Sequence, residues 1–526
     1  MTPTYRSHSI SIGSLTLGGV APVRIQSMTN TDTNDVDASV EQCRRMISAG
    51  ASLVRLTTQG KREVQNLAVV RNRLRSEGLE TPVVADIHFK PGLALEAARV
   101  VDKIRINPGN YLKGNTIDAT LSELISVCKE EGCAMRIGVN HGSLNESILN
   151  SYGDTPEGMV ESAMQFLRVC QKHNFDRVVV SMKSSNPRVM VQSVRLLVWK
   201  MTHENMSYPL HLGVTEAGDG PEGRIKSAVG MAPLLLEGMG DTLRVSLTEA
   251  PENEMPVARI LTGLFPKPGQ LPYSPFQNLA WDPFSFQRRK AGSLKIISRI
   301  PPDPSSDLRP GDIEALAVPF ETWEKDPESL RPEDTYLLLE RNQQSVQEVK
   351  YRLNRFCQEN RTSHVLYKTV HHTDDPSLFM MQLAGELGFL LIDGALDAVW
   401  VDHPKMETEQ INDILLMILQ AAGARISKTE YIACPSCGRT QFDILSRLKE
   451  IREATSHLPD LKIGVMGCIV NGPGEMADAH YGYVGAGPGK VSLYKGKEAV
   501  RKNIPEHKAL QALIELMKQE GDWLDP

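Results

Sequence analysis

The chain has 526 residues, of which 41% are hydrophobic and 23% are charged, and its formal net charge is −6. This balance is typical of a globular protein with several domains and not of a disordered chain. The mildly acidic charge predicts no global attraction to nucleic acid or to anionic membranes, and no stretch approaches the roughly 20 apolar residues of a membrane span. Residues 1–20 lack the apolar core of a signal peptide, and the scattered cysteines do not resemble a secreted disulfide framework. A cytoplasmic location is therefore expected.

Short apolar runs recur regularly over the first half of the chain, with helical patterns between them. This rhythm predicts a parallel sheet or barrel. Strands are expected to begin near Val23, Leu53, Val83, Lys103, Ala134, Arg177, Leu210 and Thr242. Eight such units fit an α/β fold of the TIM (β/α)8 barrel type over residues 1–265. A doubly wound sheet is the alternative, but the G-x-G-x-x-G fingerprint of dinucleotide-binding folds does not follow the first strand.

Basic side chains share one face of these predicted strands. In Leu53–Thr57, Arg55 and Thr57 lie on one face while Val54 and Leu56 lie on the other, because strand side chains alternate. The same alternation places six basic residues near the carboxyl ends of the strands: Arg55, His88, Arg105, Arg136, Lys183 and Arg244. These faces also carry Asp86, Asn107, Asn140, Thr215 and Ser246.

The basic residues are expected to meet at the C-terminal mouth of the barrel, where enzymes with this fold place their active sites. The counter-charges evident nearby in the sequence are Asp86, Glu216 and Glu249. Any one of the basic residues could be structural, paired with an acid or extended to the rim. Gathering all of them without an anion would cost free energy, and arginine suits phosphate oxygens. The set therefore predicts a small substrate with two phosphate groups.

Residues 266–425 are predicted to form a central α/β insert with a structural role. The segment from Phe265 to Pro310 is rich in proline, aromatic and polar residues, which marks a domain boundary. Residues 393–401 align with residues 237–245 and keep a turn glycine and the apolar positions, while Trp400 replaces Arg244. This indicates a degenerate, non-catalytic copy of part of the barrel, unless the short match arises by chance.

Residues 426–526 are predicted to form an α+β domain that presents metal ligands from its loops. A helix is expected over Phe442–Ile451, with Thr440 as its N-cap. A four-iron cluster held by cysteine alone, or a structural zinc, takes four protein ligands. This domain supplies three thiolates and one carboxylate, from Cys434, Cys437, Cys468 and Glu475. The fourth ligand is therefore weaker, and a substrate could displace it.

Structural zinc with His480 as a neutral fourth ligand is the alternative to a redox cluster. The segment Asn471–Gly474 argues against zinc, because its proline and glycines cannot continue a helix and permit a turn that brings Glu475 back toward Cys468. A glutamate on iron is a hard, replaceable ligand among soft thiolates. The C-x-x-x-C-x-x-C run of radical S-adenosylmethionine enzymes is missing. A catalytic metal centre is favoured over a structural one.

These motifs resemble those of the 4-hydroxy-3-methylbut-2-enyl diphosphate synthases of the non-mevalonate isoprenoid pathway. The resemblance rests on the segments Cys434–Arg439, Met466–Glu475 and Arg24–Thr31. It spans residues 5–260 and 426–524, with a looser match across the insert. A central insert distinguishes the three-domain form, found in plants and some bacteria, from the two-domain form.

The resemblance implies an iron-sulfur oxidoreductase that converts 2-C-methyl-D-erythritol 2,4-cyclodiphosphate into the linear allylic diphosphate, consuming two electrons and expelling a hydroxyl as water. It implies a [4Fe-4S] cluster on Cys434, Cys437 and Cys468, with Glu475 as the exchangeable ligand. It implies substrate contacts from the basic residues and from the neutral donors Asn107, Asn140, Thr215 and Ser246. Flavodoxin or ferredoxin is the implied electron donor. Glu216 is the implied acid, base or orienting group, provided that its strand ends before it, since alternation would otherwise place it opposite Thr215.

Two-domain relatives bring barrel and cluster module together between the subunits of a dimer. We hypothesise that the insert returns the cluster module to its own barrel, so that one chain makes a whole site, whether the protein is a monomer or a homodimer. A regulator that binds an iron-sulfur cluster or zinc on a retired barrel is the non-enzymatic alternative. It predicts the loss of some basic strand-end residues, whereas the sequence keeps them all.

Overall fold

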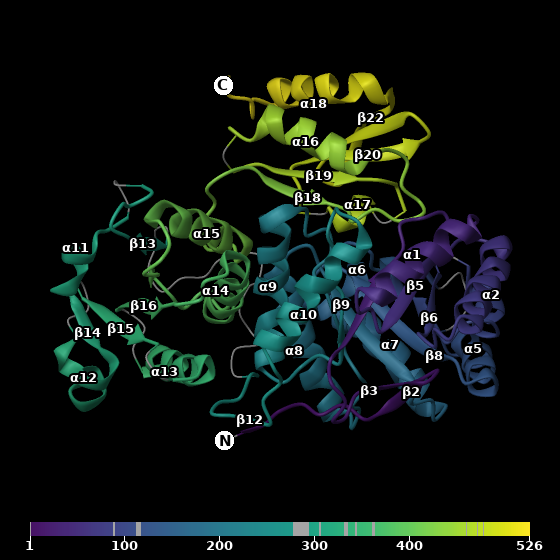
Figure 1. Ribbon diagram of the computed structural model, residues 1–526, viewed down its shortest axis with the longest axis horizontal. Helices are drawn as coiled ribbons and strands as arrows, with labels where there is room; N and C mark the ends of the chain where they lie inside the picture. Colours follow the sequence, from purple (N-terminus) through teal and green to yellow (C-terminus); the bar gives the residue numbers. More distant parts are fainter. Residues whose placement is uncertain are drawn as a thin grey trace.

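The structure is a computed structural model, and it describes residues 2–87, 90–111, 117–276, 294–303, 307–330, 335–341, 344–359, 363–458, 460–470, 472–476 and 478–525. Within these residues the chain forms a barrel, an insert beside it and a third unit, here called the cap, over the barrel mouth (Figure 1). No described helix is long and apolar enough to cross a membrane.

Eight parallel strands form the barrel in the described residues: β4 (Arg24–Met28), β5 (Leu53–Thr58), β6 (Val83–Ile87), β7 (Lys103–Ile106), β8 (Ala134–Asn140), β9 (Val178–Lys183), β10 (His211–Leu212) and β11 (Thr242–Leu243). They follow one another in chain order, with β11 pairing β4. A bridge between Val180 and Leu210 closes the ring between β9 and β10. The predicted TIM barrel is confirmed, and each expected strand start agrees within one residue.

The barrel helices are α1 (Val36–Ser48), α2 (Lys61–Ser76), α3 (Pro91–Ala98), α4 (Pro108–Tyr111), α5 (Ile117–Glu131), α6 (Glu146–Tyr152), α7 (Pro156–Lys172), α8 (Pro187–His203), α9 (Gly220–Leu236), the 3-10 turn η1 (Pro251–Asn253) and α10 (Glu254–Leu264). Several start at strong signals. Thr155, for example, accepts the Gly158 N–H at the start of α7, and Pro156 follows it. These helices cover the apolar outer face of the strands.

A short hairpin closes the amino-terminal end of the barrel. Its strands β2 (Ile10–Ile12) and β3 (Leu15–Leu17) pair antiparallel. Ile10, Ile12 and Leu17 pack against inward-facing barrel residues, which include Leu53 and Val84. The chain start, β1 (Thr2–Pro3), pairs with β12 (Gln270–Leu271) after the last barrel helix. Because apolar side chains of the hairpin cover the amino-terminal end, the polar residues inside the barrel face its C-terminal mouth.

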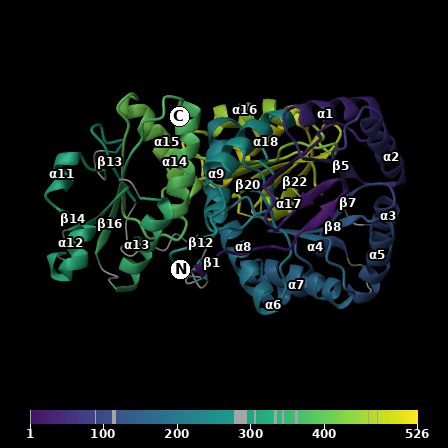
Figure 2. The ribbon, with the colours of Figure 1, turned by 60° about the horizontal axis from the view of Figure 1, so that its bottom comes forward.

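The described part of the insert contains five parallel strands in the order β13 (Lys295–Ile297), β17 (Ala398–Asp402), β16 (His364–Val370), β15 (Tyr336–Glu340) and β14 (Ala317–Pro319). Its helices are α11 (Pro310–Glu314), α12 (Phe320–Lys325), η2 (Pro327–Ser329), α13 (Val346–Glu359), α14 (Pro376–Leu391) and α15 (Thr408–Ala421). Figure 2 shows α14 and α15 between the insert sheet and the barrel.

The aligned segments 237–245 and 393–401 have the same backbone hydrogen bonds. Asp241 donates its N–H to the Leu210 carbonyl, and its carboxylate accepts the Leu210 N–H at 2.8 Å. Asp397 does the same with Val365, whose N–H lies 2.9 Å from the Asp397 carboxylate. The strand that pairs beside each segment also matches. The backbone N–H of Arg24 donates to the Asp241 carbonyl, and that of Lys295 donates to the Asp397 carbonyl. The insert therefore repeats the local structure of the last part of the barrel.

Helices α9 and α14 pack so closely that two positions of α14 have room only for glycine. A Cβ on Gly388 would lie 2.7 Å from Val229 Cα, and one on Gly385 would lie 2.9 Å from Ala232 Cβ. The alignment that pairs Asp397 with Asp241 also pairs Gly388 with Ala232 and Gly385 with Val229. The two contacts are therefore equivalent, as across an approximate two-fold axis.

Buried ion pairs reinforce this packing between the barrel and the insert. Arg195 of α8 contacts Glu237 at 2.5 Å and Asp393 of the insert at 2.6 Å. Lys350 of α13 also contacts Asp393, at 2.8 Å. Glu237 and Asp393 are themselves aligned positions of the repeat. Charged groups are thus satisfied on both sides of a largely apolar interface.

The described part of the cap has a five-stranded sheet in the order β18 (Glu430–Ala433), β19 (Lys462–Met466), β20 (Tyr481–Gly487), β21 (Lys490–Lys495) and β22 (Glu498–Pro505). The first three strands are parallel and the last two antiparallel. Its helices are α16 (Ile444–Thr455), α17 (Gly472–Glu475) and α18 (Glu506–Glu520). Asp443 rather than Thr440 is the N-cap of α16, since the Asp443 side chain accepts the Ser446 N–H.

The cap lies against the barrel of its own chain (Figure 1). Ala433, at the end of β18, forms a parallel bridge with Ala217 of the barrel. The Thr248 hydroxyl donates to the Ala433 and Cys434 carbonyls at 3.3 and 3.2 Å. The end of β18 is thereby tied to the barrel just before the first cysteine of the C-x-x-C pair.

Candidate active site

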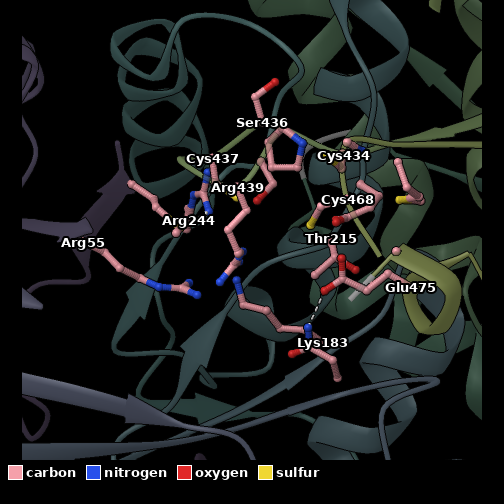
Figure 3. Close-up of a pocket in the computed structure, with 18 of the residues that line it drawn as sticks. Arg55, Lys183, Thr215, Arg244, Cys434, Ser436, Cys437, Arg439, Cys468 and Glu475 are labelled. Atoms are coloured by element: carbon pink, nitrogen blue, oxygen red, sulfur yellow. Dashed lines mark hydrogen bonds between the residues drawn. The ribbon is translucent and has the colours of Figure 1, made fainter. Parts of the chain in front are cut away.

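A cavity lies between the barrel mouth and the cap. Side chains from both domains point into it (Figure 3). The predicted site residues that line it are Arg55, Arg105, Arg136, Asn140, Lys183, Thr215, Glu216, Arg244, Ser246, Cys434, Cys437, Cys468 and Glu475. The structure therefore brings together basic strand ends and cysteine loops that are far apart in the sequence.

Two predicted substrate ligands, Asp86 and Asn107, lie outside the described lining of this cavity. Asp86 is fully buried and pairs with Arg55 at 2.7 Å and Arg105 at 3.4 Å. Its position makes it a counterion for the arginines. Asn107 donates to the Ser143 hydroxyl at 3.0 Å and accepts the Gly109 N–H. His88 lies outside the described residues.

Arg136 and Lys183 are buried, with only 1% and 5% of their surfaces exposed, yet they form no ion pair within the described residues. Arg136 Nε and Nη1 also have no hydrogen-bond partner there. Burial, followed by Arg55 and Arg105, lowers the pKa of Arg136. Burial, followed by Arg136 and Arg244, lowers the pKa of Lys183. An anion at this position would relieve both the repulsion and the lost hydration.

The acidic partners of the basic residues differ in two cases from those expected from the sequence. Glu249, expected near the cations, pairs instead with Arg224 at 2.6 Å. Glu254, which the sequence did not single out, contacts Arg244 at 3.1 Å and accepts the Ser27 hydroxyl at 2.8 Å. Burial opposes ionisation of Arg244, but Glu254, Glu216 and Cys437 together outweigh it and raise the Arg244 pKa. Glu254 opens α10, so its approach to the barrel strand depends on how that helix packs.

The first cysteine loop is held against the barrel by close contacts. Ser436 has a left-handed φ of 62°, and the Thr440 hydroxyl, expected to cap a helix, accepts the Cys437 N–H at 3.0 Å. A Cβ on Gly438 would lie 2.7 Å from the Thr31 carbonyl oxygen. Glycine is needed there because the loop meets the barrel backbone.

Arg439 enters the cavity from the cap and was not among the predicted site residues. It is 8% exposed, and its Nη1 lies 3.7 Å from Asp86. Burial opposes its ionisation, but Cys437, Asp86 and Cys468 outweigh it and raise the Arg439 pKa. The residue belongs to the C-x-x-C-G-R motif, and that position was the signal available in the sequence. That Arg439 lies close to the barrel could be learned only from the structure, in which the cap is docked on the barrel mouth.

Glu475 reaches the cavity from the one-turn helix α17, although the segment before it was expected to be a turn. Asn140 of β8 donates to Glu475 Oε1 at 2.5 Å. The Ser185 hydroxyl donates to the Glu475 carbonyl at 3.1 Å. Asn471, at the start of the predicted turn, lies outside the described residues. The barrel thus contacts both the carboxylate and the backbone of Glu475.

Glu216 points into the same cavity as Thr215, which strand alternation forbids. The reason is local, because β10 ends at Leu212 and Glu216 has a φ of 51°. The strand thus ends before Glu216, which is the condition under which we expected this residue to act as an acid, a base or an orienting group. Burial and the neighbouring Glu475 carboxylate raise the pKa of Glu216 well above its ordinary value. This shift favours the protonated form of the Glu216 carboxyl.

The three cysteine thiols of the cap face the same cavity. Cys434, Cys437 and Cys468 line one cavity, but no three histidine, cysteine or acidic side chains in the described chain lie close enough to hold one ion. His480, the alternative zinc ligand, accepts the Lys462 N–H at 3.1 Å and is absent from the described cavity lining. Burial, followed by Glu216 and Cys437, raises the pKa of the Cys434 thiol. Metal binding would have to offset that cost to form the thiolate.

The fold and the cavity together define a TIM-barrel protein whose cationic mouth is covered by a cysteine-bearing cap. A model of the GcpE TIM-barrel domain matches residues 7–259, and a model of the GcpE C-terminal domain matches residues 430–519. The chain belongs to the GcpE family.

Curated relatives extend the similarity over the whole chain. It is 43% identical to 4-hydroxy-3-methylbut-2-en-1-yl diphosphate synthase (flavodoxin) of Parabacteroides distasonis, with 99% of this chain and 98% of the relative covered. The protein of the same name from Porphyromonas gingivalis is 43% identical, with 97% of each chain covered. That from Akkermansia muciniphila is 40% identical, with 99% and 97% covered. The family, the enzymatic character and the synthase activity expected from the motifs are confirmed, so the regulator alternative is wrong.

Proposed function

We propose that the cavity binds 2-C-methyl-D-erythritol 2,4-cyclodiphosphate and that the chain reduces it to 4-hydroxy-3-methylbut-2-enyl diphosphate. The observation that carries this proposal is that one cavity is lined both by basic residues of the barrel and by the cysteines of the cap. Arg136 and Lys183 form no ion pair in the described residues, and they share the cavity with three cysteines and Glu475. A cyclic diphosphate would neutralise the cations while its carbon-bound oxygens face the cysteine loops.

The barrel residues would bind and orient the diphosphate. We assign phosphate contacts to the basic side chains and neutral hydrogen bonds to the donors beside them: Arg55, Arg105, Arg136, Lys183, Arg244, Asn140, Thr215 and Ser246. Asp86 keeps Arg55 and Arg105 oriented through its ion pairs. Arg439 joins the set from the cap. His88 and Asn107 remain in the proposal on the strength of the sequence alone.

Cys434, Cys437 and Cys468 would hold a [4Fe-4S] cluster, with Glu475 as the replaceable ligand of the fourth iron. Such a cluster supplies single electrons and a Lewis-acidic iron when it is bound. Glu216 would hold a proton on its carboxyl and deliver it to the hydroxyl that leaves as water. Ala433 and Thr248 join the cap to the barrel, which keeps the cysteine loops beside the barrel mouth.

Three further assignments complete the proposal. The electron donor is a flavodoxin, as the names of the relatives state for those proteins. Activity with reduced ferredoxin but not with reduced flavodoxin would revise this assignment. The protein works in the cytoplasm, where thiols stay reduced. The active site forms within one chain, which the contacts between the cap and its own barrel support.

Anaerobic reconstitution with iron and sulfide, followed by metal analysis and absorption spectroscopy, tests the cofactor. About four irons per chain and a visible charge-transfer band are expected. The reconstituted protein should then convert the cyclic diphosphate when reduced flavodoxin is supplied. Cys468→Ala should lose iron and activity together. Zinc without iron, and no visible band, would overturn the redox centre.

Mixing two inactive variants tests whether one chain makes the site. Arg136→Ala removes a cation from the barrel, and Cys468→Ala removes a ligand from the cap. If each barrel uses its own cap, the mixture stays inactive, because neither chain has both halves intact. Recovered activity would show instead that sites form between chains.

A further inference from the structure

Asp154 joins the barrel to the cap through a single carboxylate. The residue lies between α6 and α7, and its Oδ1 accepts the Gly142 N–H at 3.0 Å. Its Oδ2 accepts a hydrogen bond from Lys497 Nζ at 2.9 Å. Lys497 lies in the turn between β21 and β22 of the cap. Asp154 therefore contacts a loop of the barrel mouth and a hairpin of the cap at the same time.

The loop that Asp154 holds is the one on which α17 rests. A Cβ on Gly142 would lie 1.9 Å from the Gly474 carbonyl oxygen, and a Cβ on Gly474 would lie 2.5 Å from the Gly142 oxygen. Gly142 also has a φ of 77°, which favours glycine. The contact between the two backbones leaves no room for a side chain. A small shift of Gly142 must therefore move Gly474 and the next residue, Glu475.

The same barrel loop also binds the carboxylate that follows Gly474. Asn140, two residues before Gly142, donates to Glu475 Oε1 at 2.5 Å, and Ser185 donates to the Glu475 carbonyl. The position of Glu475 thus depends on residues 140–142. Asp154 holds that segment in place by accepting the Gly142 N–H.

The charge of Asp154 is matched to its two neighbours. Its side chain is 14% exposed, and His141 Nε2 lies 3.6 Å from its Oδ1. Burial opposes ionisation, but His141 and Lys497 outweigh it and lower the pKa of Asp154. Lys497 is 60% exposed, so this pair contributes little to global stability. Its placement points to a role in positioning the cap.

We propose that Asp154 is a positioning residue that couples docking of the β21–β22 hairpin to the placement of Glu475 in the active site. The role of Glu475 rests on the proposed function, whereas the coupling itself is a property of the folded chain. When Lys497 meets Asp154, the 140–142 loop is held and α17 seats on Gly142. When the pair is broken, Asp154 holds Gly142 less firmly, and Asn140 and Ser185 remain as the hydrogen-bond donors from the barrel to Glu475.

Three substitutions separate the contacts of Asp154. Lys497→Ala removes the ion pair and leaves Gly142 bonded. Asp154→Asn keeps an oxygen for the Gly142 N–H but loses the charge, and Asp154→Ala loses both. Lys495→Ala is the matched control, because Lys495 lies in the same hairpin but pairs with Glu520 of the cap itself.

Hydrogen exchange of residues 472–476, measured by mass spectrometry on the full-length reconstituted protein, provides the main readout. Exchange there should rise by about tenfold in Lys497→Ala and Asp154→Asn and further in Asp154→Ala, as local opening becomes more frequent. Lys495→Ala should match the unsubstituted protein. The double variant Asp154→Ala with Lys497→Ala should exchange no faster than Asp154→Ala alone, because the pair is a single link.

Spectra of the reduced cluster and steady-state kinetics provide the second readout. A misplaced Glu475 should alter the electron paramagnetic resonance signal and lower kcat by about 10- to 100-fold in Asp154→Ala, with a smaller change in KM. Unchanged exchange in both Lys497→Ala and Asp154→Ala would overturn the proposal, as would an equal effect of Lys495→Ala. If the unsubstituted protein lacks synthase activity, the proposed function fails, while the exchange data still decide the coupling. Lys497 is largely exposed, so its variant is expected to fold.

Discussion

Glu216 of the barrel and Glu475 of the cap meet in one cavity, although they come from different domains. Glu216 is only 4% exposed, and the Glu475 carboxylate beside it is a cause of its raised pKa. The left-handed backbone at Glu216 turns its side chain to this position. Two carboxyl groups so placed suit different tasks, one as a proton donor and one as a ligand.

Glu216→Gln should lower kcat by about 100- to 10,000-fold, the usual contribution of a general acid, while KM changes little. The amide has nearly the same shape but cannot release a proton. Steady-state assays with the cyclic diphosphate check this, with iron content measured as the control for cluster assembly. A kcat within threefold of the unsubstituted enzyme would assign the proton donor elsewhere.

Arg136→Met should stabilise the protein without substrate and weaken substrate binding. The guanidinium is buried with Nε and Nη1 unpartnered in the described residues, and replacing buried charge with an apolar side chain can stabilise by about 1–4 kcal/mol. KM should rise by about 10- to 100-fold, since a hydrogen bond to a charged group contributes about 1.5–3 kcal/mol. Urea unfolding and kinetics measure the two effects. Lower stability with unchanged KM would mean that Arg136 is structural.

Gly388→Ala should loosen the insert from the barrel. The added Cβ would lie 2.7 Å from Val229 Cα, and overpacking of this kind costs about 1–3 kcal/mol. Gly263→Ala is the control, because a Cβ there meets nothing within 4 Å. The control lies in α10 and should gain about 0.5–1 kcal/mol from helix propensity. Thermal unfolding distinguishes the two, and equal shifts would contradict the close packing of α9 on α14.

Glu430→Gln should make stability less sensitive to acid. Lys226 and Lys462 contact Glu430 at 2.8 and 3.1 Å, and although burial opposes ionisation they lower its pKa to about 2. Its contribution is therefore full above the unfolded pKa of about 4.3 and is lost as the pH falls toward 2. The carboxylate is one-fifth exposed, so the expected loss is about 2–3 kcal/mol. Urea unfolding at pH 6 and pH 3 should show a smaller difference for the variant. Equal pH sensitivity would contradict the buried pairing.

Period-two alternation and strand spacing predicted the barrel and most of its cavity-lining residues. Both signals are local, so neighbouring residues carry them whatever the rest of the chain does. Asp86 shows the limit of such reasoning. Alternation placed it on the inner face correctly, but its pairing with Arg55 and Arg105 makes it a counterion. The facing partner on another strand decides that role.

The sequence did not reveal that β10 ends before Glu216, so that strand alternation no longer applies there. The left-handed φ of a non-glycine residue depends on the contacts that hold it. Here those contacts include the bridge between Ala217 and Ala433 of the cap. The residue next to Glu216 is therefore joined to a domain more than 200 residues away along the chain.

The sequence by itself determined the family, the barrel, the cysteine motifs and the basic character of the mouth, because short motifs and side-chain periodicity encode them. The tertiary structure alone decided that Arg439 enters the mouth, that Glu254 neutralises Arg244, and that Asp154 links the cap to Gly142. These contacts join distant segments; Asn140 and Glu475, for example, are separated by 335 positions. Their geometry depends on how the folded domains pack, and no local pattern in the chain records that packing.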